Sequence, residues 1–373
     1  MKIGLIGCGY VADYYVSTLR LHPELKVVGV ADRDMARAQA LASAHGFRRF
    51  DSVAALLADP DVQMVLNLTN PREHFGVSRA ALLAGKHVYS EKPFAMEMAQ
   101  ALELVRLAED AGLQISSAPC SLFGQTAQTL WRELRAERVG QVRAVYAEID
   151  DGMVHRMAYR KWKSRSGLPW PYRDEFEVGC TVEHAGYYLA WFAAWFGPAE
   201  RVTAFASVQV PDKVPGEPLG PNGPDLTVAC IQFRNGVVAR LTCSILAPHD
   251  HRLRVVGDDG VLSTRDCWDY RSPVHSQRFV TVRRRSFISP WRTRHRLVPS
   301  AYPRAGTGGA QDMDFARGPA ELAAAIEQRR TPLLSARFCL HVNEMVLAIH
   351  NAASCAAYTM TTDFEPLAVP AGV

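Results

Sequence analysis

Residues 2–12 read KIGLIGCGYVA. Residues 2–6 predict a short apolar strand, and a helix pattern follows from residue 11 to residue 21. The turn between them fits G-x-G-x-x-A. Glycines at such a junction allow a tight turn and let the backbone approach a pyrophosphate, whose charge then lies at a helix N-terminus. We therefore predict a dinucleotide site that includes Gly7, Gly9, Tyr10, Val11 and Ala12.

The same alternation of strand and helix continues through the first 120 residues. The predicted strands are residues 26–31, 62–68, 87–89 and 113–116, and the helices are residues 33–45, 52–57, 75–84 and 96–111. Helices of this length between strands imply βαβ units and a parallel sheet. We assign residues 1–120 to an α/β Rossmann domain that binds NAD or NADP.

The pattern changes beyond residue 120. A helix at residues 126–136 precedes predicted strands at residues 142–149, 202–208, 226–233, 237–244, 252–256 and 279–282. Proline-rich residues 211–224 are expected to be a lid or a surface loop, and residues 301–309 a second loop. We assign residues 121–373 to an α/β substrate-binding and oligomerisation domain with an open, largely antiparallel sheet. Its last helices, residues 314–328 and 336–353, are candidates for packing back on the first domain.

Composition excludes several classes of protein. The 373 residues suit two domains, and 48% hydrophobic with 21% charged residues excludes a disordered or fibrous chain. The longest apolar run, residues 187–196, is far shorter than the ~20 residues of a membrane span, and no signal peptide is apparent. We expect a cytoplasmic protein without a membrane partner. No C-x-x-C spacing or Cys/His cluster is present, so no metal site is predicted.

An acidic residue follows the second predicted strand. Asp32 lies 23 residues after Gly9, where a carboxylate can accept hydrogen bonds from the adenosine ribose. A carboxylate repels a 2′-phosphate, so Asp32 favours NAD over NADP. Arg33 can stack on adenine or bind that phosphate, which keeps NADP as the alternative.

Two further motifs follow the third and fourth strands. Thr69-Asn70-Pro71 precedes His74, and Glu91-Lys92-Pro93 comes after residues 87–89. Together with the glycine turn, these motifs resemble the Gfo/Idh/MocA oxidoreductases, over nearly the whole chain. The resemblance implies a Rossmann domain, an open antiparallel sheet, and a sugar or cyclitol substrate between them. It implies cofactor contacts from Thr69, Asn70, His74, Glu91 and Lys92.

Lys92 is the first predicted catalytic residue. It follows a strand at the edge of the sheet where open α/β folds bind ligands. A lysine that is partly desolvated beside a nicotinamide is expected to have a lowered pKa. Such a lysine can polarise a substrate hydroxyl or relay its proton.

The other catalytic candidates lie in residues 179–187, GCTVEHAGY. Many family members have an acid and a histidine one helical turn apart here, whereas this chain has Glu183 and Tyr187. Tyrosine serves as the acid/base in some relatives, so Tyr187 is our first candidate, with Lys92 favouring its phenolate. Glu183 would bind substrate hydroxyls or tune Lys92. His184, roughly 100° round the helix, is the rival, and a core role is the alternative for Tyr187.

A turn-rich segment precedes this helix. It contains Trp170, Tyr172 and Arg173. The family resemblance suggests that a tryptophan and a basic residue here approach the cofactor or substrate. Trp170 and Arg173 therefore complete the predicted cofactor site.

Residues 265–296 carry nine arginines against Asp266 and Asp269, a segment charge of +7. The remaining chain is then −3, because the total is +4. One interpretation is a solvated hairpin or an interface between subunits. The other is an anion site for a phosphorylated or nucleotide-linked sugar, because guanidinium groups bind phosphates with two hydrogen bonds. No reading helix or stacking motif accompanies the charge, so no nucleic-acid partner is predicted.

These features predict an NAD(P)-dependent dehydrogenase or ketoreductase acting on a sugar, cyclitol or nucleotide-sugar. The expected partners are that small carbohydrate and further copies of the chain, as a dimer or tetramer joined through the C-terminal sheet. One alternative is an NAD-dependent glycoside hydrolase of the same fold. The other is a non-catalytic regulator that senses dinucleotide or sugar.

Overall fold

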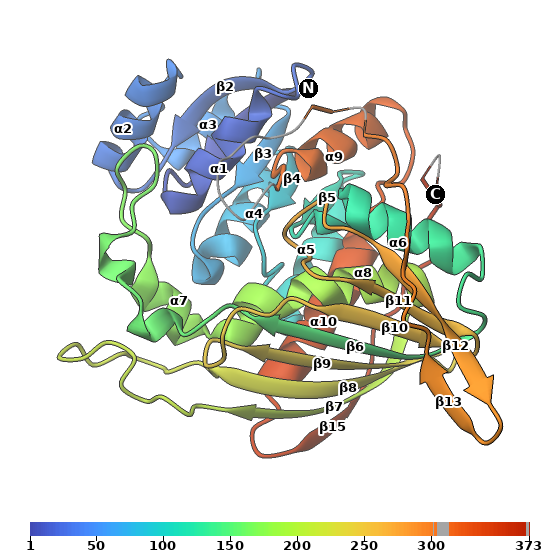
Figure 1. Cartoon of the computed structure of the whole chain (residues 1–373). Coiled ribbons are helices and arrows are strands. Elements are labelled where there is room, and N and C mark those ends of the chain that lie inside the picture. The colour runs from blue at the N-terminus through green and yellow to red at the C-terminus, as the bar shows by residue number, and fades with distance from the viewer. Residues whose placement is uncertain (301, 304–312, 371–372) are drawn as a thin grey trace.

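The chain forms two sheets with helices between and around them, as the computed structural model in Figure 1 shows. The structure describes residues 1–300, 302–303, 313–370 and 373. The predicted loop at residues 301–309 therefore lies outside the described residues, except for positions 302 and 303. None of the described helices is both long and apolar enough to cross a membrane.

The first sheet has five parallel strands in the order β2-β1-β3-β4-β5. Its strands are β1 (Lys2–Ile6), β2 (Lys26–Ala31), β3 (Met64–Asn67), β4 (His87–Ser90) and β5 (Ile115–Ser117). Its helices are α1 (Tyr10–Leu19), α2 (Met35–His45), α3 (Val53–Ala58), α4 (His74–Leu83) and α5 (Met98–Asp110). The predicted Rossmann architecture is confirmed. Strands β1, β3 and β4 are almost entirely buried, because helices cover both faces of a parallel sheet.

The second sheet has ten strands and is antiparallel except where β6 pairs with β9. The strands are β6 (Val142–Asp150), β7 (Ala199–Ser207), β8 (Leu226–Phe233), β9 (Val238–Ser244), β10 (Leu253–Gly257), β11 (Gly260–Thr264), β12 (His275–Val282), β13 (Arg285–Ile288), β14 (Thr293–Arg294) and β15 (Ala356–Thr359). The helices are α6 (Gln125–Arg135), α7 (Tyr172–Val178), α8 (Gly186–Phe196), α9 (Arg317–Glu327) and α10 (Ala336–His350). The mostly antiparallel sheet is confirmed, whereas β11, β13, β14, β15 and α7 were not predicted.

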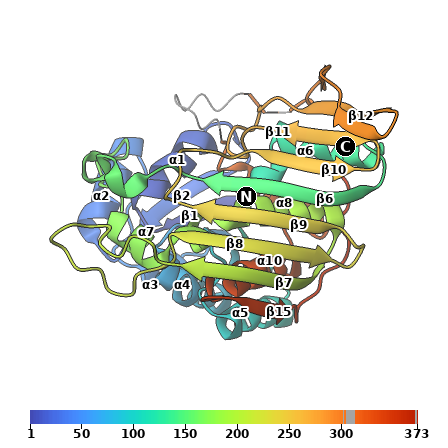
Figure 2. The ribbon, with the colours of Figure 1, turned by 60° about the horizontal axis from the view of Figure 1, so that its bottom comes forward.

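Helices α8 and α10 lie on one face of the large sheet, between it and the first domain (Figure 1). Figure 2 shows the large sheet from its other face, where no helix lies in front of the strands. The alternating burial along β7 and β8 fits a sheet with one covered face. Exposed Tyr146, Phe205 and Val238 belong to these open strands.

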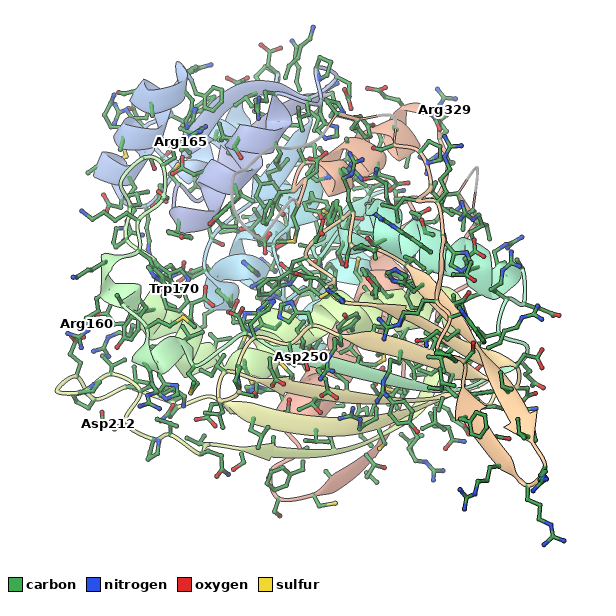
Figure 3. All side chains as sticks on the ribbon, in the orientation of Figure 1. Arg160, Arg165, Trp170, Asp212, Asp250 and Arg329 are labelled. Atoms are coloured by element: carbon green, nitrogen blue, oxygen red, sulfur yellow. The ribbon has the colours of Figure 1, made fainter. Side chains whose placement is uncertain are left out.

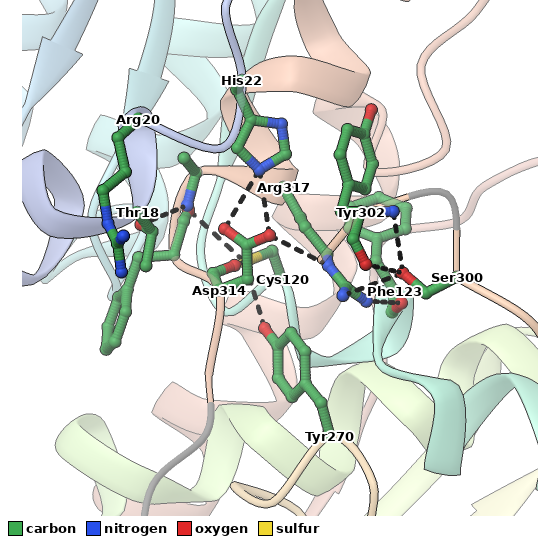
Figure 4. Close-up of polar contacts among 12 residues, drawn as sticks. Thr18, Arg20, His22, Cys120, Phe123, Tyr270, Ser300, Tyr302, Asp314 and Arg317 are labelled. Carbon is green, nitrogen blue, oxygen red and sulfur yellow. Dashed lines mark hydrogen bonds and ion pairs between the residues drawn. The ribbon is translucent and has the colours of Figure 1, made fainter. Parts of the chain in front are cut away.

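The end of the chain returns to the first domain, where α9 packs on β4 and β5. Figure 4 shows the polar contacts that hold this return. His22 Nε2 lies 2.9 Å from Asp314 Oδ2, and Arg317 donates to the same carboxylate at 3.1 Å. Arg317 also donates to the Phe123 carbonyl at 2.9 Å. One buried carboxylate therefore ties the first domain to the base of α9.

The proline-rich residues 211–224 are anchored rather than free. Lys213 is 1% exposed, and its ammonium lies 3.1 Å from the buried Asp225 carboxylate. The same carboxylate also accepts hydrogen bonds from the amides of Gln209 and Val210, at 2.7 and 2.8 Å. A buried ion pair with satisfied lone pairs fixes this loop to the sheet.

Candidate active site

The glycine turn has the geometry that a bound pyrophosphate needs. Gly7 has φ +98°, and a Cβ there would lie 2.5 Å from the Leu68 carbonyl carbon. Gly9 begins α1 without a side-chain cap, and a Cβ at Gly9 would meet nothing within 4 Å. The N-terminus of α1 is therefore open, and its amides and dipole fit an anionic group. The residues present fit a dinucleotide.

Asp32 is fixed at the end of β2 by the turn itself. Its carboxylate accepts hydrogen bonds from the Cys8 amide at 2.7 Å and the Asp34 amide at 2.8 Å. A carboxylate has further lone pairs, which ribose hydroxyls can use. Arg33 is exposed and lies 3.1 Å from Glu73.

One cavity of about 540 Å³ runs from the glycine turn to the second domain. From the predicted cofactor residues, its lining includes Gly9, Tyr10, Val11, Thr69, Asn70, Glu91, Lys92 and Trp170. The predicted catalytic residues Lys92, Glu183, His184 and Tyr187 also line it. Residues from the first sheet edge and from the start of α8 therefore meet at one space, which is the geometric requirement for hydride and proton transfer in one site.

His74 is not brought to this cavity. It is fully buried, with Nδ1 2.8 Å from the Pro93 carbonyl and Nε2 2.8 Å from the Thr69 carbonyl. The prediction of direct cofactor contact by His74 is therefore corrected. Its ring instead links the loop after β3 to the loop after β4, so it positions Thr69 and Lys92.

Glu91 also positions its neighbour. Its carboxylate accepts from the Tyr15 hydroxyl at 2.7 Å and from the Lys92 amide at 3.0 Å. The Lys92-Pro93 peptide bond is cis. The Glu91 carboxylate therefore joins the backbone amide of Lys92 to Tyr15 of the first domain.

Lys92 forms an ion pair with Glu183 across the cavity. Burial disfavours its charge, but Glu183, Glu175 and Glu91 outweigh burial and raise the pKa of Lys92. Our prediction of a lowered pKa was wrong, because it rested on desolvation and did not count the combined charge of Glu183, Glu175 and Glu91. Lys92 is therefore a cation at neutral pH, suited to stabilising a developing negative charge on oxygen.

Sequence reasoning missed Glu175, which lies on α7 and lines the cavity. Burial, followed by the charge of Glu183, raises the pKa of Glu175 well above its usual value. The neighbouring charge of Glu183 therefore adds to burial in favouring the protonated form of Glu175. The signal in the sequence was the position of Glu175 shortly before Gly179, where the catalytic segment begins, but α7 itself was not predicted.

The start of α8 explains why both Tyr187 and His184 reach the cavity. Residues Thr181–Ala185 form a π-helical turn, which widens the usual helical spacing. Tyr187 is 9% exposed, and its ring packs edge-on against Trp268. Burial raises the pKa of Tyr187, although Lys92 opposes this, so the phenol is protonated at neutral pH.

His184 lines the same wall and is more exposed than Tyr187. Its Nε2 is 3.7 Å from Asp151 Oδ2, and its Nδ1 has no hydrogen-bond partner among the described residues. Burial lowers the pKa of His184 well below its usual value, so the ring is neutral. Burial also raises the pKa of Asp151 to about 6. Ionisable groups with strongly shifted pKa values are concentrated at functional sites.

Residues 163–169 form a strap that crosses from the second domain to α1. Lys163 and Pro169 pair at its base, next to Trp162 and Trp170, which line the cavity. At its tip the Ser166 amide and hydroxyl donate to Asp13 at 2.7 and 2.6 Å. Figure 3 shows Arg165 of the strap beside the first domain and Trp170 near its base.

Arg173 points away from the cavity, contrary to our prediction. It is exposed, donates to the Pro218 carbonyl at 3.1 Å, and lies 3.5 Å from Glu177. It therefore supports the proline-rich loop and not the cofactor. The partners of its guanidinium group are the Glu177 carboxylate on α7 and the Pro218 carbonyl in that loop.

Comparison with known proteins agrees with this geometry. Residues 1–118 match the model of an oxidoreductase family with an NAD-binding Rossmann fold, and residues 127–263 match the GFO/IDH/MocA C-terminal domain. The chain belongs to the GFO/IDH/MocA oxidoreductase family. It is therefore an NAD(P)-binding oxidoreductase.

Similar proteins of the GFO/IDH/MocA type differ in substrate. Bovine trans-1,2-dihydrobenzene-1,2-diol dehydrogenase is 27% identical over 72% of this chain and 75% of its own. A 3-ketoreductase from Actinomadura kijaniata, solved with NADP and TDP-benzene, aligns with TM-score 0.72 at 21% identity, over 95% of this chain and 98% of its own. A Bordetella pertussis dehydrogenase, solved with NADH and UDP-GlcNAcA, aligns with TM-score 0.71 at 18% identity, over 97% of this chain and 99% of its own. The two solved neighbours, one with NADP and one with NADH, show the fold.

In this GFO/IDH/MocA chain the arginine-rich residues 265–296 do not supply the cavity with positive charge. All nine of the arginines are exposed, and Arg283, Arg284 and Arg285 lie at the turn between β12 and β13. No described arginine lines the cavity. The interpretation of this segment as the anion site of the substrate cavity is therefore not supported. A solvated hairpin or a subunit interface remains.

Proposed function

We propose that this protein transfers a hydride between NAD(P) and a hydroxyl-bearing or carbonyl carbon of a neutral sugar, cyclitol or similar diol. The observation that carries the proposal is the single cavity in which Gly9 and Tyr10 lie at one end and Lys92 and Tyr187 at the other. The family and the Rossmann fold support the binding of NAD(P). The second-domain residues Tyr187 and Glu183, which line the cavity with Lys92, support the transfer of the proton.

The charge of the cavity supports a neutral substrate. Its lining has five carboxyl groups, from Glu91, Asp151, Asp174, Glu175 and Glu183. Lys92 contributes the positive charge of the same lining. A phosphate on the substrate, away from the N-terminus of α1 that fits the pyrophosphate of the cofactor, would be repelled by these carboxylates, whereas sugar hydroxyls can donate to them. We therefore favour free polyols over the nucleotide-sugars that the sequence left open.

The protonation states suit reduction of a carbonyl near neutral pH. The bound nicotinamide supplies the hydride. The Tyr187 phenol, which is protonated, gives its proton to the carbonyl oxygen, and the Lys92 ammonium stabilises the negative charge that develops there. Glu183 holds Lys92 in place through the ion pair, and Glu175 keeps its proton beside that pair. The reverse reaction would need Tyr187 to lose its proton first, which its raised pKa opposes.

A screen of substrates tests this proposal. The protein is mixed with neutral sugars, cyclitols, vicinal diols, the matching ketones, and nucleotide-sugars, and the absorbance of reduced nicotinamide is followed with both cofactors. We expect turnover with neutral compounds, and loss of turnover in Lys92→Ala with unchanged NAD(P) affinity. Undiminished turnover in Lys92→Ala would contradict the proposed mechanism.

The strap gives one reason to keep glycoside hydrolysis as a second candidate. A strap bonded to α1 at Asp13 favours a cofactor that stays bound through many turnovers. Hydrolysis by transient oxidation returns the hydride and needs such a resident cofactor. Release of nitrophenol from a nitrophenyl glycoside, without net NADH, would support this candidate over the first. The sensing regulator is disfavoured, because Lys92 and Tyr187 both lie in the cavity.

We also propose that the chain forms homo-oligomers through the open face of the large sheet. Exposed apolar side chains there include Tyr146, Phe205 and Val238. Such side chains are normally covered in stable assemblies. Sedimentation of the wild type and of Phe205→Glu tests this, and a wild-type monomer would contradict it.

A further inference from the structure

Two loops of the large sheet meet at the wall of the cavity beside His184. Asp151 follows β6, while His249 and His251 lie between β9 and β10. One ligand atom from each of Asp151, His249 and His251 lies within 4.8 Å of the other two. The sequence predicted no metal site, because Asp151 is far from the two histidines along the chain.

The backbone explains why these three side chains gather. Asp150 and Asp250 exchange both of their amide–carbonyl hydrogen bonds, at 2.9 and 3.0 Å. Neighbours of a bridged residue in extended backbone project to the side opposite to it, so His249 and His251 share one side. Asp250, labelled in Figure 3, instead accepts from Arg252. The bridge therefore places Asp151 against the histidine pair.

His251 has the arrangement of a metal ligand. It is 1% exposed, and its Nδ1 lies 3.2 Å from Asp266 Oδ1. Its Nε2 is buried and has no hydrogen-bond partner in the part of the chain that the structure describes. A buried polar atom without a partner is costly, so it needs an explanation. A carboxylate on one imidazole nitrogen and a metal on the other is the common arrangement in metalloproteins.

The ligand types select the metal. Two imidazoles and one carboxylate suit zinc, whereas magnesium and calcium prefer sets made only of oxygen. Three protein ligands leave a fourth position free. Asp151 and its neighbour His184 line the cavity, so a ligand entering the cavity can reach that position. His251 also belongs to an adjoining group with Asp266 and Cys267. Of these five side chains Asp151 is the one that lines the cavity, so Asp151 joins the proposed ion to the cavity.

We propose that Asp151, His249 and His251 bind one zinc ion, whose open coordination position takes an oxygen of the molecule in the cavity. Asp266 is a positioning residue that orients the His251 ring. Binding of the ion does not depend on the proposed oxidoreductase reaction. Failure of the zinc site would leave cofactor binding and substrate turnover as measured, and the two proposals can therefore fail separately.

Cobalt and zinc titrations test the site. The full-length protein is treated with a chelator, and CoCl₂ is added while visible absorption is recorded, because tetrahedral cobalt absorbs strongly. Zinc affinity is then measured by calorimetry with ZnCl₂. We expect one equivalent of each metal to bind, with zinc displacing cobalt. Asp266→Asn should weaken zinc roughly 10–100-fold, as expected for an outer-shell partner.

The ligand variants decide between this site and a cluster of hydrogen bonds. His249 is exposed, so His249→Ala should fold, and it should abolish the tetrahedral cobalt spectrum. His275→Ala, a partly buried histidine of the same domain outside the cluster, should keep it. Unchanged NAD(P) binding reports that each variant is folded. Failure of the wild type to bind either metal, or an unchanged spectrum in His249→Ala, would overturn the proposal and leave a His–Asp cluster only.

Discussion

The contact between the strap and α1 should control how fast the cofactor leaves. Asp13 is 6% exposed and accepts two hydrogen bonds from Ser166, at 2.7 and 2.6 Å. Burial opposes its charge, but the hydroxyls of Ser164 and Ser166 and the Ser166 amide hold the pKa of Asp13 below its usual value. Asp13 is therefore ionised at neutral pH, and the strap is held by charged hydrogen bonds.

Asp13→Asn keeps the size of the side chain and one acceptor oxygen but removes the charge. Hydrogen bonds to a charged group contribute about 1.5–3 kcal/mol each, against about 0.5–1.5 kcal/mol for neutral ones. We therefore expect the variant to lose about 1–3 kcal/mol of strap closure, which corresponds to roughly a 5–150-fold shift towards the open strap. Release of NADH should accelerate by a similar factor.

Stopped-flow fluorescence, with excess NAD chasing bound NADH, measures this release rate. Ser166→Ala removes the hydroxyl but keeps the amide bond, so its effect should be smaller than that of Asp13→Asn. Asp61→Asn is the matched control, because Asp61 is an exposed carboxylate paired with Lys2. Equal release rates in the wild type and Asp13→Asn would refute gating by the strap.

Three other predictions concern the site and the fold. Tyr187→Phe keeps the packed ring but removes the acid, so turnover should fall about 10²–10⁴-fold without loss of NAD(P) affinity, as steady-state kinetics and calorimetry would show. Lys213→Met leaves Asp225 buried and unpaired, which should destabilise the native chain by about 3–5 kcal/mol in denaturant unfolding and open residues 211–224 to protease. His341 Nε2 accepts from the Ala199 amide, and burial lowers its pKa from 6.5 to about 4. A base with a lowered folded pKa contributes stability that is present above pH 6.5 and is lost as pH falls to about 4, by roughly 3 kcal/mol in thermal unfolding at graded pH.

Controls for these three are available in the chain. Tyr358→Phe removes a hydroxyl outside the cavity, and it should leave turnover unchanged. A Lys213→Met chain as stable as the wild type would show that the buried pair is dispensable. His341→Ala should flatten the acid dependence of stability, and an unaltered dependence would assign it to other groups.

The order of elements in the first domain could be predicted because its signals are local. Each strand and its following helix are contiguous, so the period of apolar residues identifies them. Strand β13 follows β12 in a hairpin, but all of its side chains are exposed, so it shows no alternation of buried and exposed residues. Strand β15 is a short edge strand whose partner β7 is remote in the chain, and no local pattern carries that pairing.

The site was predictable in its members but not in its electrostatics. The motifs identified Lys92, Glu183 and Tyr187, and the structure brings them to one cavity. The charge state of Lys92 depends on Glu175 and Glu183, which come from another domain. His74 and Arg173 were misplaced for the same reason, because the partners that hold them are remote in sequence or on an unpredicted helix.

The position of α9 has a consequence for how the chain folds during synthesis. Ala316, Ala320 and Leu322 belong to the same buried cluster as Leu5 and Tyr89 of the first sheet. Gly318 lies so near that a Cβ there would be 2.1 Å from the Tyr89 hydroxyl. All five strands of that sheet leave the ribosome some 200 residues before this helix does. Part of one apolar face of the nascent Rossmann domain, beside α1, therefore stays uncovered until the last part of the chain is made, and during that interval a chaperone or α9 supplied as a separate peptide could cover it.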